Sequence, residues 1–368
     1  MKNLSRYTLM ALSVAMYLAL AKLGLLLAFE HASVSPVWPP TGFAISLLLL
    51  TQGKFWPAIA VGAFLANFSS NSPLGATTCI AIGNTLEAVI GYVIISKNRT
   101  SDAYDHLYFR SILFILGSVV ASFTSAIIGV SSLALFGSIS KSQFVGLFGT
   151  WLTGDLLGAL IITPLFAFDT PSWQKNFREI RRVTSLGSIG LILVSLGGIF
   201  IAPEGTHFPL LLFPVLLVVA SVGGPYTMRL SVVLIAVCSV LATINDMGPF
   251  ASGVVAHDLM YLQLFMLGVS LTSIAILSFK SIKELTAASI VLLVGWFFSG
   301  VLYYTFTEQD AAFDEQHYSA LIHEVEDRIV DRMRLYVDYL ISGASLFAAS
   351  ESVEPDEWRA FVDYSELV

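Results

Sequence analysis

Two carboxyl side chains lie deep inside long apolar segments of the sequence, where ionisable groups are rare. Glu87 and Asp155 each fall about eleven residues from one end of a segment long enough to cross a bilayer. We therefore expect both near the middle of a membrane. An ionisable group at that depth costs at least about 2.5 to 3.5 kcal/mol on insertion scales, so each carboxyl needs a partner or a water-lined cavity.

Three other polar or amphipathic residues are placed to join these carboxyls. Asn84 precedes Glu87 by three residues and Trp151 precedes Asp155 by four, so each pair shares a helix face. Lys22 lies in the far half of the first apolar segment, within snorkelling reach of the surface. One interpretation is an internal polar network, or a lysine–carboxylate pair, that holds the helices together. The other is a pocket for a small polar ligand or a proton.

The stretch "SPVWPPTG" (Ser35 to Gly42) is a second candidate site. Trp38 suits a membrane interface, and Pro39 and Pro40 suit the first turn of a helix. That helix is only about 12 residues, roughly 18 Å, which is too short to span. Its positive N-terminal end would then lie below the surface and form a candidate wall of a ligand cavity, with Asn67 facing it from the next short helix. A plain break between two helices is the alternative interpretation.

Composition indicates an integral membrane protein. Hydrophobic residues make up 56% of the chain, the mean hydropathy is +0.78 and charged residues are only 12%, against about 25% in soluble domains. The two cysteines, Cys79 and Cys238, lie in apolar segments and fit neither a disulfide framework nor a metal site. We find no nucleophile–base set and no phosphate loop, so we expect no enzymatic activity, no cofactor and no nucleic-acid partner.

The hydropathy pattern predicts an all-α, polytopic bundle of about eight full-length helices and a short helix pair, followed by one more helix. The short pair covers Pro39–Leu50 and Trp56–Asn67. The long segments are Tyr7–Phe29, Ala76–Ser96, Ser111–Phe136, Phe144–Phe168, Val183–Ile201, Phe208–Val222, Tyr226–Ile244 and Leu259–Phe279, and the additional helix is Leu285–Phe306.

Basic residues predict the orientation of these helices. They gather in four groups, before the first segment and in three of the loops, including "KNFREIRR" at 175–182. A cytoplasmic N-terminus puts all four groups on the cytoplasmic side and leaves only Lys141 on the other. Whether the short pair crosses the membrane or re-enters it does not alter this count. The additional helix then leads outward, and residues from Thr307 onward are expected outside the cytoplasm.

The last 62 residues are strongly acidic, with 15 acidic and 4 basic side chains from Thr307 to Val368. Their apolar residues recur at spacings of three, four and seven, which predicts an amphipathic helix that continues from the last membrane segment. Glu354 and Pro355 look like the cap and first turn of a second helix. The apolar positions are Ile322, Val325, Ile329, Met333, Tyr336, Leu340 and Phe347.

Several motifs resemble a known family. "SPVWPPTGFAISLLLLTQGKFWPAIAVGAFLANF", "AIGNTLEAVIGYVI" and "GTWLTGDLLGALIITPLF" are similar, in this order, to segments of the membrane-associated sensor domain of the first MASE type, and the resemblance covers about residues 7 to 280. The tail, particularly "RLYVDYLISGASLFAASESVEPDEWRAFV", resembles the start of a CHASE extracellular sensor domain. We therefore expect a MASE-type domain over 1–280, a membrane helix over 285–306 and an incomplete CHASE-like segment over 307–368.

The resemblance implies a sensory input module in the bacterial cytoplasmic (inner) membrane, with an unidentified small-molecule ligand. Proteins with such modules carry histidine kinase, diguanylate cyclase or phosphodiesterase outputs; we expect an output of this kind beyond the C-terminus, and a homodimer. A small-solute transporter or channel is the alternative, because interrupted helices and mid-membrane carboxylates are common at transporter sites. The second half of the sequence, however, has no matching interrupted pair.

Overall fold

The computed structural model describes most of the chain as helix and divides it into two compact units, Met1–Leu293 and Val294–Val368. The predicted helix Leu285–Phe306 lies outside the described residues, and the predicted domain boundaries stay predictions. The residues that the structure describes are 5–27, 35–68, 73–97, 106–167, 180, 182–201, 209–251, 255–278, 318 and 322–364.

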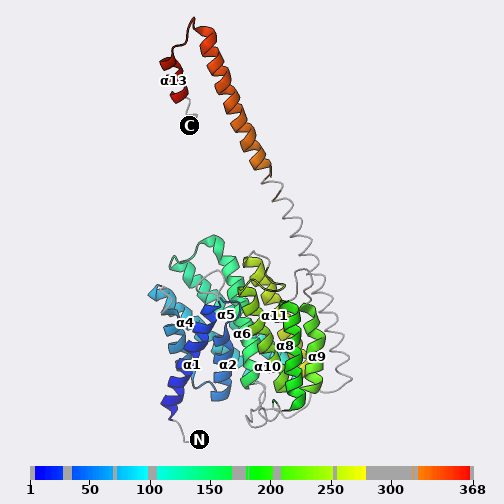
Figure 1. Cartoon of the computed structure of the whole chain (residues 1–368). Coiled ribbons are helices and arrows are strands. Elements are labelled where there is room, and N and C mark those ends of the chain that lie inside the picture. Colours follow the sequence, from blue (N-terminus) through cyan, green and yellow to red (C-terminus); the bar gives the residue numbers. More distant parts are fainter. Residues whose placement is uncertain are drawn as a thin grey trace. The chain divides into compact units, whose positions relative to one another are not determined.

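The first unit is a bundle of helices, which confirms the all-α prediction (Figure 1). Among the described residues, seven helices are long and apolar enough to cross a membrane. Two short helices, α2 (Pro39–Thr51) and α3 (Trp56–Phe68), lie between the first two of them in sequence. The seven are α1 (Arg6–Leu26), α4 (Leu74–Ser96), α5 (His106–Leu135), α6 (Phe144–Ala167), α8 (Val183–Phe200), α10 (Pro225–Ile244) and α11 (Val255–Ser278).

The expected helix at 208–222 is shorter than the other candidate spans. Its described part consists of a 3-10 turn, Pro209–Leu211, and α9 (Leu212–Val222). These 14 residues reach roughly 21 Å, less than the 30 Å hydrocarbon core. Gly224 follows with φ 97°, a conformation that suits glycine, and Pro225 then begins α10. This segment therefore belongs with α2 and α3 as a short apolar helix.

Local sequence explains where α2 begins and ends. Pro39 and Pro40 occupy its first two positions, as predicted, since proline lacks the N–H that a first turn leaves unused. Gln52 ends it in the left-handed region with φ 53° and donates its N–H to the carbonyl of Leu48. Gly53 follows with φ 77°. The chain thus reverses after only 13 helical residues.

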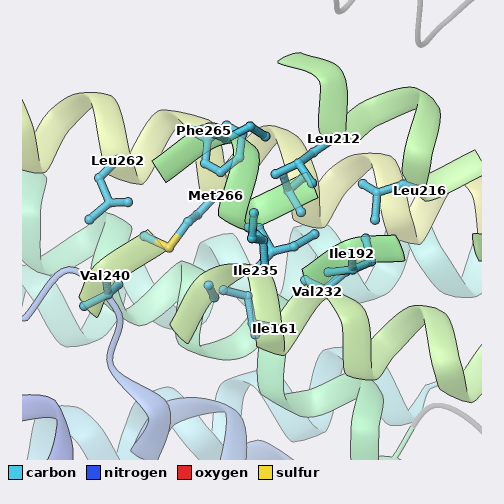
Figure 2. Packing of buried hydrophobic residues seen from close by; sticks show 14 of the residues in the cluster. Ile161, Ile192, Leu212, Leu216, Val232, Ile235, Val240, Leu262, Phe265 and Met266 are labelled. Atoms are coloured by element: carbon cyan, nitrogen blue, oxygen red, sulfur yellow. The ribbon is translucent and has the colours of Figure 1, made fainter. Parts of the chain in front are cut away.

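Five apolar clusters lie among the described residues of the first unit, and two of them are larger than the others. The largest joins α6, α8, α9, α10 and α11, and Figure 2 shows its side chains pointing toward one another from these helices. A second core is formed by α1, α2, α3 and α4 and includes Tyr17, a fully buried aromatic residue. The residues labelled in Figure 2 are Ile161, Ile192, Leu212, Leu216, Val232, Ile235, Val240, Leu262, Phe265 and Met266.

The second unit contains a long helix over residues 322–349 and the short helix α13 (Pro355–Tyr364). The backbone N–H of Glu354 donates to the Glu357 carboxylate at 3.2 Å, which confirms the predicted start of this helix. Trp358 of α13 packs on Phe347, with ring centroids 5.3 Å apart. The seven predicted apolar positions, from Ile322 to Phe347, are exposed in this unit.

Candidate functional site

A buried polar cluster lies where five helices of the first unit meet. The two carboxyls singled out from the sequence are both inside it, since Glu87 and Asp155 are each only 1% exposed. We define the polar cluster as Tyr17 of α1, Thr41 of α2, Asn84 and Glu87 of α4, Ser122 and Ser125 of α5, and Trp151 and Asp155 of α6.

Thr41 connects the two carboxyls at the first turn of the short helix α2. Its hydroxyl lies 3.0 Å from Glu87 Oε2 and 3.3 Å from Asp155 Oδ1. A hydroxyl has one hydrogen to donate, so it serves these two acceptors alternately or shares its hydrogen between them. A residue on α2 thereby ties together α4 and α6, which carry the carboxyls.

Asn84 organises the other half of the polar cluster. Its amide nitrogen donates to the Tyr17 hydroxyl at 3.3 Å, and its amide oxygen accepts from the Ser125 hydroxyl at 3.1 Å. The Trp151 indole N–H donates to the Ser125 oxygen at 3.3 Å. The sequence-predicted residues Asn84 and Trp151 are therefore joined through Ser125, which the sequence argument did not name.

Three oxygens of the polar cluster have no hydrogen-bond partner among the described residues. They are Glu87 Oε1, Asp155 Oδ2 and Ser122 Oγ, and all are buried. The Ser122 hydroxyl lies beside the Glu87 carboxyl. Buried polar groups are normally satisfied, so three such oxygens in neighbouring side chains make this cluster unusual.

Glycines let α2 and the segment before it press directly on α6. A Cβ added at Gly158 would overlap the carbonyl oxygen of Trp38, and one added at Gly42 would overlap Gly158. The Trp38 N–H also donates to the Gly154 carbonyl at 2.9 Å. This backbone contact holds the N-terminus of α2 against α6, and so places Thr41 at the carboxyls.

The opening motif is therefore more than a break between helices. Pro39 and Pro40 are buried, and the Trp38 ring packs closely on Gly24 of α1. On the other side, Gln263 of α11 donates its amide to the carbonyl of Pro36 at 3.2 Å. These contacts fix the first turn of α2 inside the bundle, as expected from its length.

Five predicted site residues are not members of the polar cluster: Trp38, Pro39 and Pro40, which lie beside it, and Lys22 and Asn67. Lys22 is exposed on α1, whereas Glu87 and Asp155 are buried. Asn67 is half-buried and donates its amide to the carbonyl of Ala63 in its own helix, at 2.8 Å. The ligand-binding role assigned to all nine predicted residues stays a prediction.

A cavity elsewhere in the first unit is too small to be a second candidate ligand site. It has a volume of about 20 Å³, which is room for one or two water molecules. Its lining is mostly apolar and includes the buried side chain of Arg229 with Ser270 and Ser273. Nothing larger than water fits there, so we assign it no ligand.

Comparison with known protein families gives one match. The MASE1 family matches residues 9–279, which is most of the chain and the whole of the helical bundle described above. The chain belongs to the MASE1 family. A search of curated proteins and a search of solved structures each found no match.

MASE1 membership identifies residues 9–279 as a membrane sensory module of the kind found in signalling proteins. It agrees with the resemblance read from the sequence over 7–280. No match extends into the tail, so nothing supports the predicted CHASE-like segment. The comparison found no catalytic domain in the chain. The polar cluster is thus a buried feature of the MASE1 domain, contributed by α1, α2, α4, α5 and α6.

The sequence argument did not identify four members of the polar cluster: Tyr17, Thr41, Ser122 and Ser125. A threonine in a first turn and a serine inside a membrane helix are both common, so neither residue type raises suspicion alone. Thr41 stands 46 residues from Glu87 and 114 from Asp155. One signal was available, because Thr41 directly follows the two prolines of a helix already predicted to begin inside the membrane.

Proposed function

We propose that the chain is the sensory input part of a bacterial signalling receptor and that the polar cluster is where it detects its signal. In this proposal a small ligand or a membrane signal alters the contacts of Thr41 with Glu87 and Asp155. The change is passed on as a shift of the helices that carry them. The observation that carries the proposal is the Thr41 hydroxyl, which bridges two buried carboxyls from the end of a short helix.

Physical reasoning supports a switch at this place. Two uncompensated carboxyls inside a membrane are costly, so any change in their occupancy has a large effect on the energy of the surrounding packing. The contact between α2 and α6 is made by backbone atoms and glycines at close range. The two helices therefore cannot move closer together by small degrees. A signal at the carboxyls would therefore favour a discrete rearrangement over a diffuse one.

The receptor proposal includes a location and an output. We propose insertion in the bacterial cytoplasmic membrane, a cytoplasmic N-terminus, an acidic tail outside the cytoplasm and a histidine kinase or cyclic-di-GMP enzyme as output. The tail would contribute an extracytoplasmic, CHASE-like sensor. We also propose a homodimer, because the exposed apolar positions of the helix over 322–349 offer a seam; light scattering of the detergent-solubilised protein gives the mass that tests it.

The first experiment tests Asp155→Asn in the native gene. We expect the variant protein to insert and accumulate normally, since asparagine keeps the shape of the side chain, and the cellular output to stop responding to the signal. The output is measured as phosphorylation of the partner regulator or as the cyclic-di-GMP level. Asp258→Asn is the matched control, because Asp258 is also a buried carboxyl but lies on α11, outside the polar cluster.

Two results would contradict the sensor proposal. A normal response in the Asp155→Asn variant would remove the polar cluster from signal detection. Uptake of a solute by liposomes that contain the purified chain would favour the alternative, a small-solute transporter or channel, which buried carboxyls beside the first turn of a short helix also suit. An in-frame kinase or cyclase in the downstream gene sequence would favour the receptor.

A further inference from the structure

When both of its carboxyls are ionised, the polar cluster has more negative charge than the described side chains around it compensate. Glu87 and Asp155 are both almost fully buried, and among the described residues neither takes part in a salt bridge. The N-terminus of α2 is one source of positive charge beside the carboxyls, since Thr41 is the third residue of this helix. A helix terminus supplies roughly half an elementary charge. Half a charge does not balance two carboxylates in a membrane interior.

The oxygens without partners show where the missing charge would sit. Glu87 Oε1, Asp155 Oδ2 and Ser122 Oγ are buried, and Ser122 is directly beside Glu87. The Thr41 hydroxyl joins the same two carboxyls from a third helix. The helices α2, α4, α5 and α6 thus direct oxygen atoms toward one place, each from a side chain fixed by packing.

The donor set selects the class of ligand. All of these groups are hard oxygen donors, which suit alkali and alkaline-earth ions and not the transition metals that histidine and cysteine bind. The described residues contain no group of three His, Cys, Asp or Glu side chains that could hold a metal ion. Calcium takes six to eight oxygen ligands, and magnesium usually keeps several waters. Two buried carboxyls and two buried hydroxyls offer fewer ligands than calcium takes, and they suit a cation that needs fewer oxygen ligands.

We propose that Glu87, Asp155, Thr41 and Ser122 form a binding site for a small monovalent cation of the size of Na⁺ or Li⁺. The cation offsets one negative charge of the polar cluster, gives the three oxygens a partner and holds α2, α4, α5 and α6 together. Protons compete with it for the same carboxyls. The inference deepens the sensor proposal and rests on the same polar cluster, because it names the class of ligand that the cluster would take.

The test measures the thermal unfolding of the purified full chain in detergent, in chloride salts of sodium, lithium, potassium, calcium or choline at equal ionic strength. At mildly alkaline pH we expect sodium and lithium to raise the melting temperature by several degrees over choline, because a ligand that binds only the folded protein stabilises it. At mildly acidic pH the shift should shrink, since protons occupy the carboxyls. The other titratable residue of the polar cluster is Tyr17, whose hydroxyl is held by Asn84.

Variants locate the effect at the polar cluster. Glu87→Gln and Asp155→Asn should abolish the sodium-dependent shift, and Asp258→Asn should retain it. Thr41→Ser keeps the hydroxyl and should retain the shift, whereas Thr41→Val keeps the shape without the hydroxyl and should weaken apparent sodium binding at least about tenfold. This last pair decides the matter if the carboxyl variants fail to fold.

Three outcomes would overturn the cation site: identical melting temperatures in all salts at both pH values, an equal shift in Glu87→Gln, or a stronger effect of calcium than of sodium. These failures differ from a failure of the sensor proposal. A receptor that responds to another ligand would leave the sodium shift absent and the Asp155 phenotype intact. Sodium uptake into liposomes would keep the binding site and remove the receptor.

Discussion

Asn84 shows how much one amide contributes inside the membrane. Both ends of its side chain are used, one on Tyr17 and the other on Ser125, so it links α1, α4 and α5. Asn67 offers a natural comparison, because its amide bonds only to the carbonyl of Ala63 in its own helix. The same residue type thus has an interhelical role at one position and a local role at the other.

We predict that Asn84→Leu lowers the free energy of unfolding by about 1 kcal/mol, since it leaves the Tyr17 hydroxyl and the Ser125 hydroxyl each without one partner. Asn67→Leu should change it by no more than a few tenths of a kcal/mol, as for other surface changes. Denaturant unfolding in mixed micelles measures both values. Equal losses in the two variants would show that the interhelical bonds of Asn84 do not contribute more than a local one.

At the residue scale, sequence reasoning found the groups that are unusual in lipid and missed those that are ordinary. Glu87 and Asp155 were identifiable because a carboxyl in an apolar segment needs an explanation. Thr41 and Ser125 were not, because only the fold brings them to the carboxyls. Lys22 was included for its charge, yet the structure leaves it exposed, since the helix face it occupies is not the buried face of Ser13, Tyr17, Ala21 and Gly24.

The contact between α2 and α6 is the critical feature at the scale of elements. Gly158 meets the carbonyl of Trp38 and the backbone approach there leaves no room for a Cβ. Gly149, in the same helix and two to three turns earlier, has nothing within 4 Å of an added Cβ. These two glycines test whether the close approach, and not helix propensity, requires glycine.

We predict opposite signs for alanine at these two glycines. Gly158→Ala should destabilise the protein by about 1 to 3 kcal/mol, as expected when a methyl group is forced into a packed contact. Gly149→Ala should stabilise it by up to about 1 kcal/mol through helix propensity. Thermal melting of both variants in detergent measures the difference. A neutral Gly158→Ala would mean that α2 can move away from α6 without loss.

Element boundaries were predictable where proline and glycine mark them. Pro39 and Pro40 set the start of α2, and Glu354 with Pro355 set the start of α13. The segment at 208–222 was harder, because an apolar run of 15 residues fits both a short helix and a tilted membrane span. What decides it is the turn at Gly223 and Gly224, whose conformation follows from packing that a hydropathy pattern does not contain.

At the scale of the whole molecule, the proposed orientation follows from the basic loops. It can be tested with two introduced cysteines, after the native Cys79 and Cys238 have been replaced by serine. Ser138→Cys, in the turn after α5, should then react with a membrane-impermeant maleimide added to intact cells with permeabilised outer membranes. Thr184→Cys, in the exposed first turn of α8, should react only after the cytoplasmic membrane is opened. The reverse labelling pattern would invert the topology.

The class of the whole molecule was accessible from composition, and its family from the order of a few motifs. The MASE1 match over residues 9–279 agrees with both. The tail is different, because 62 residues with 15 acidic side chains and one amphipathic pattern suit many helical segments, and the resemblance to a CHASE domain has no second observation behind it. The interior of the bundle could not be predicted, since helix order does not specify which faces meet.

The shared hydroxyl of Thr41 has a further consequence for how information could be stored in this membrane domain. One hydrogen has two acceptors on two different helices, so the site has two arrangements that differ by the direction of a single O–H bond. In one, α2 is bonded to α4; in the other, to α6. The carboxyl stretching bands of an infrared difference spectrum, recorded with Thr41→Val as the reference, would distinguish the two arrangements. The state of the membrane domain would then depend on which carboxyl accepts the Thr41 hydrogen.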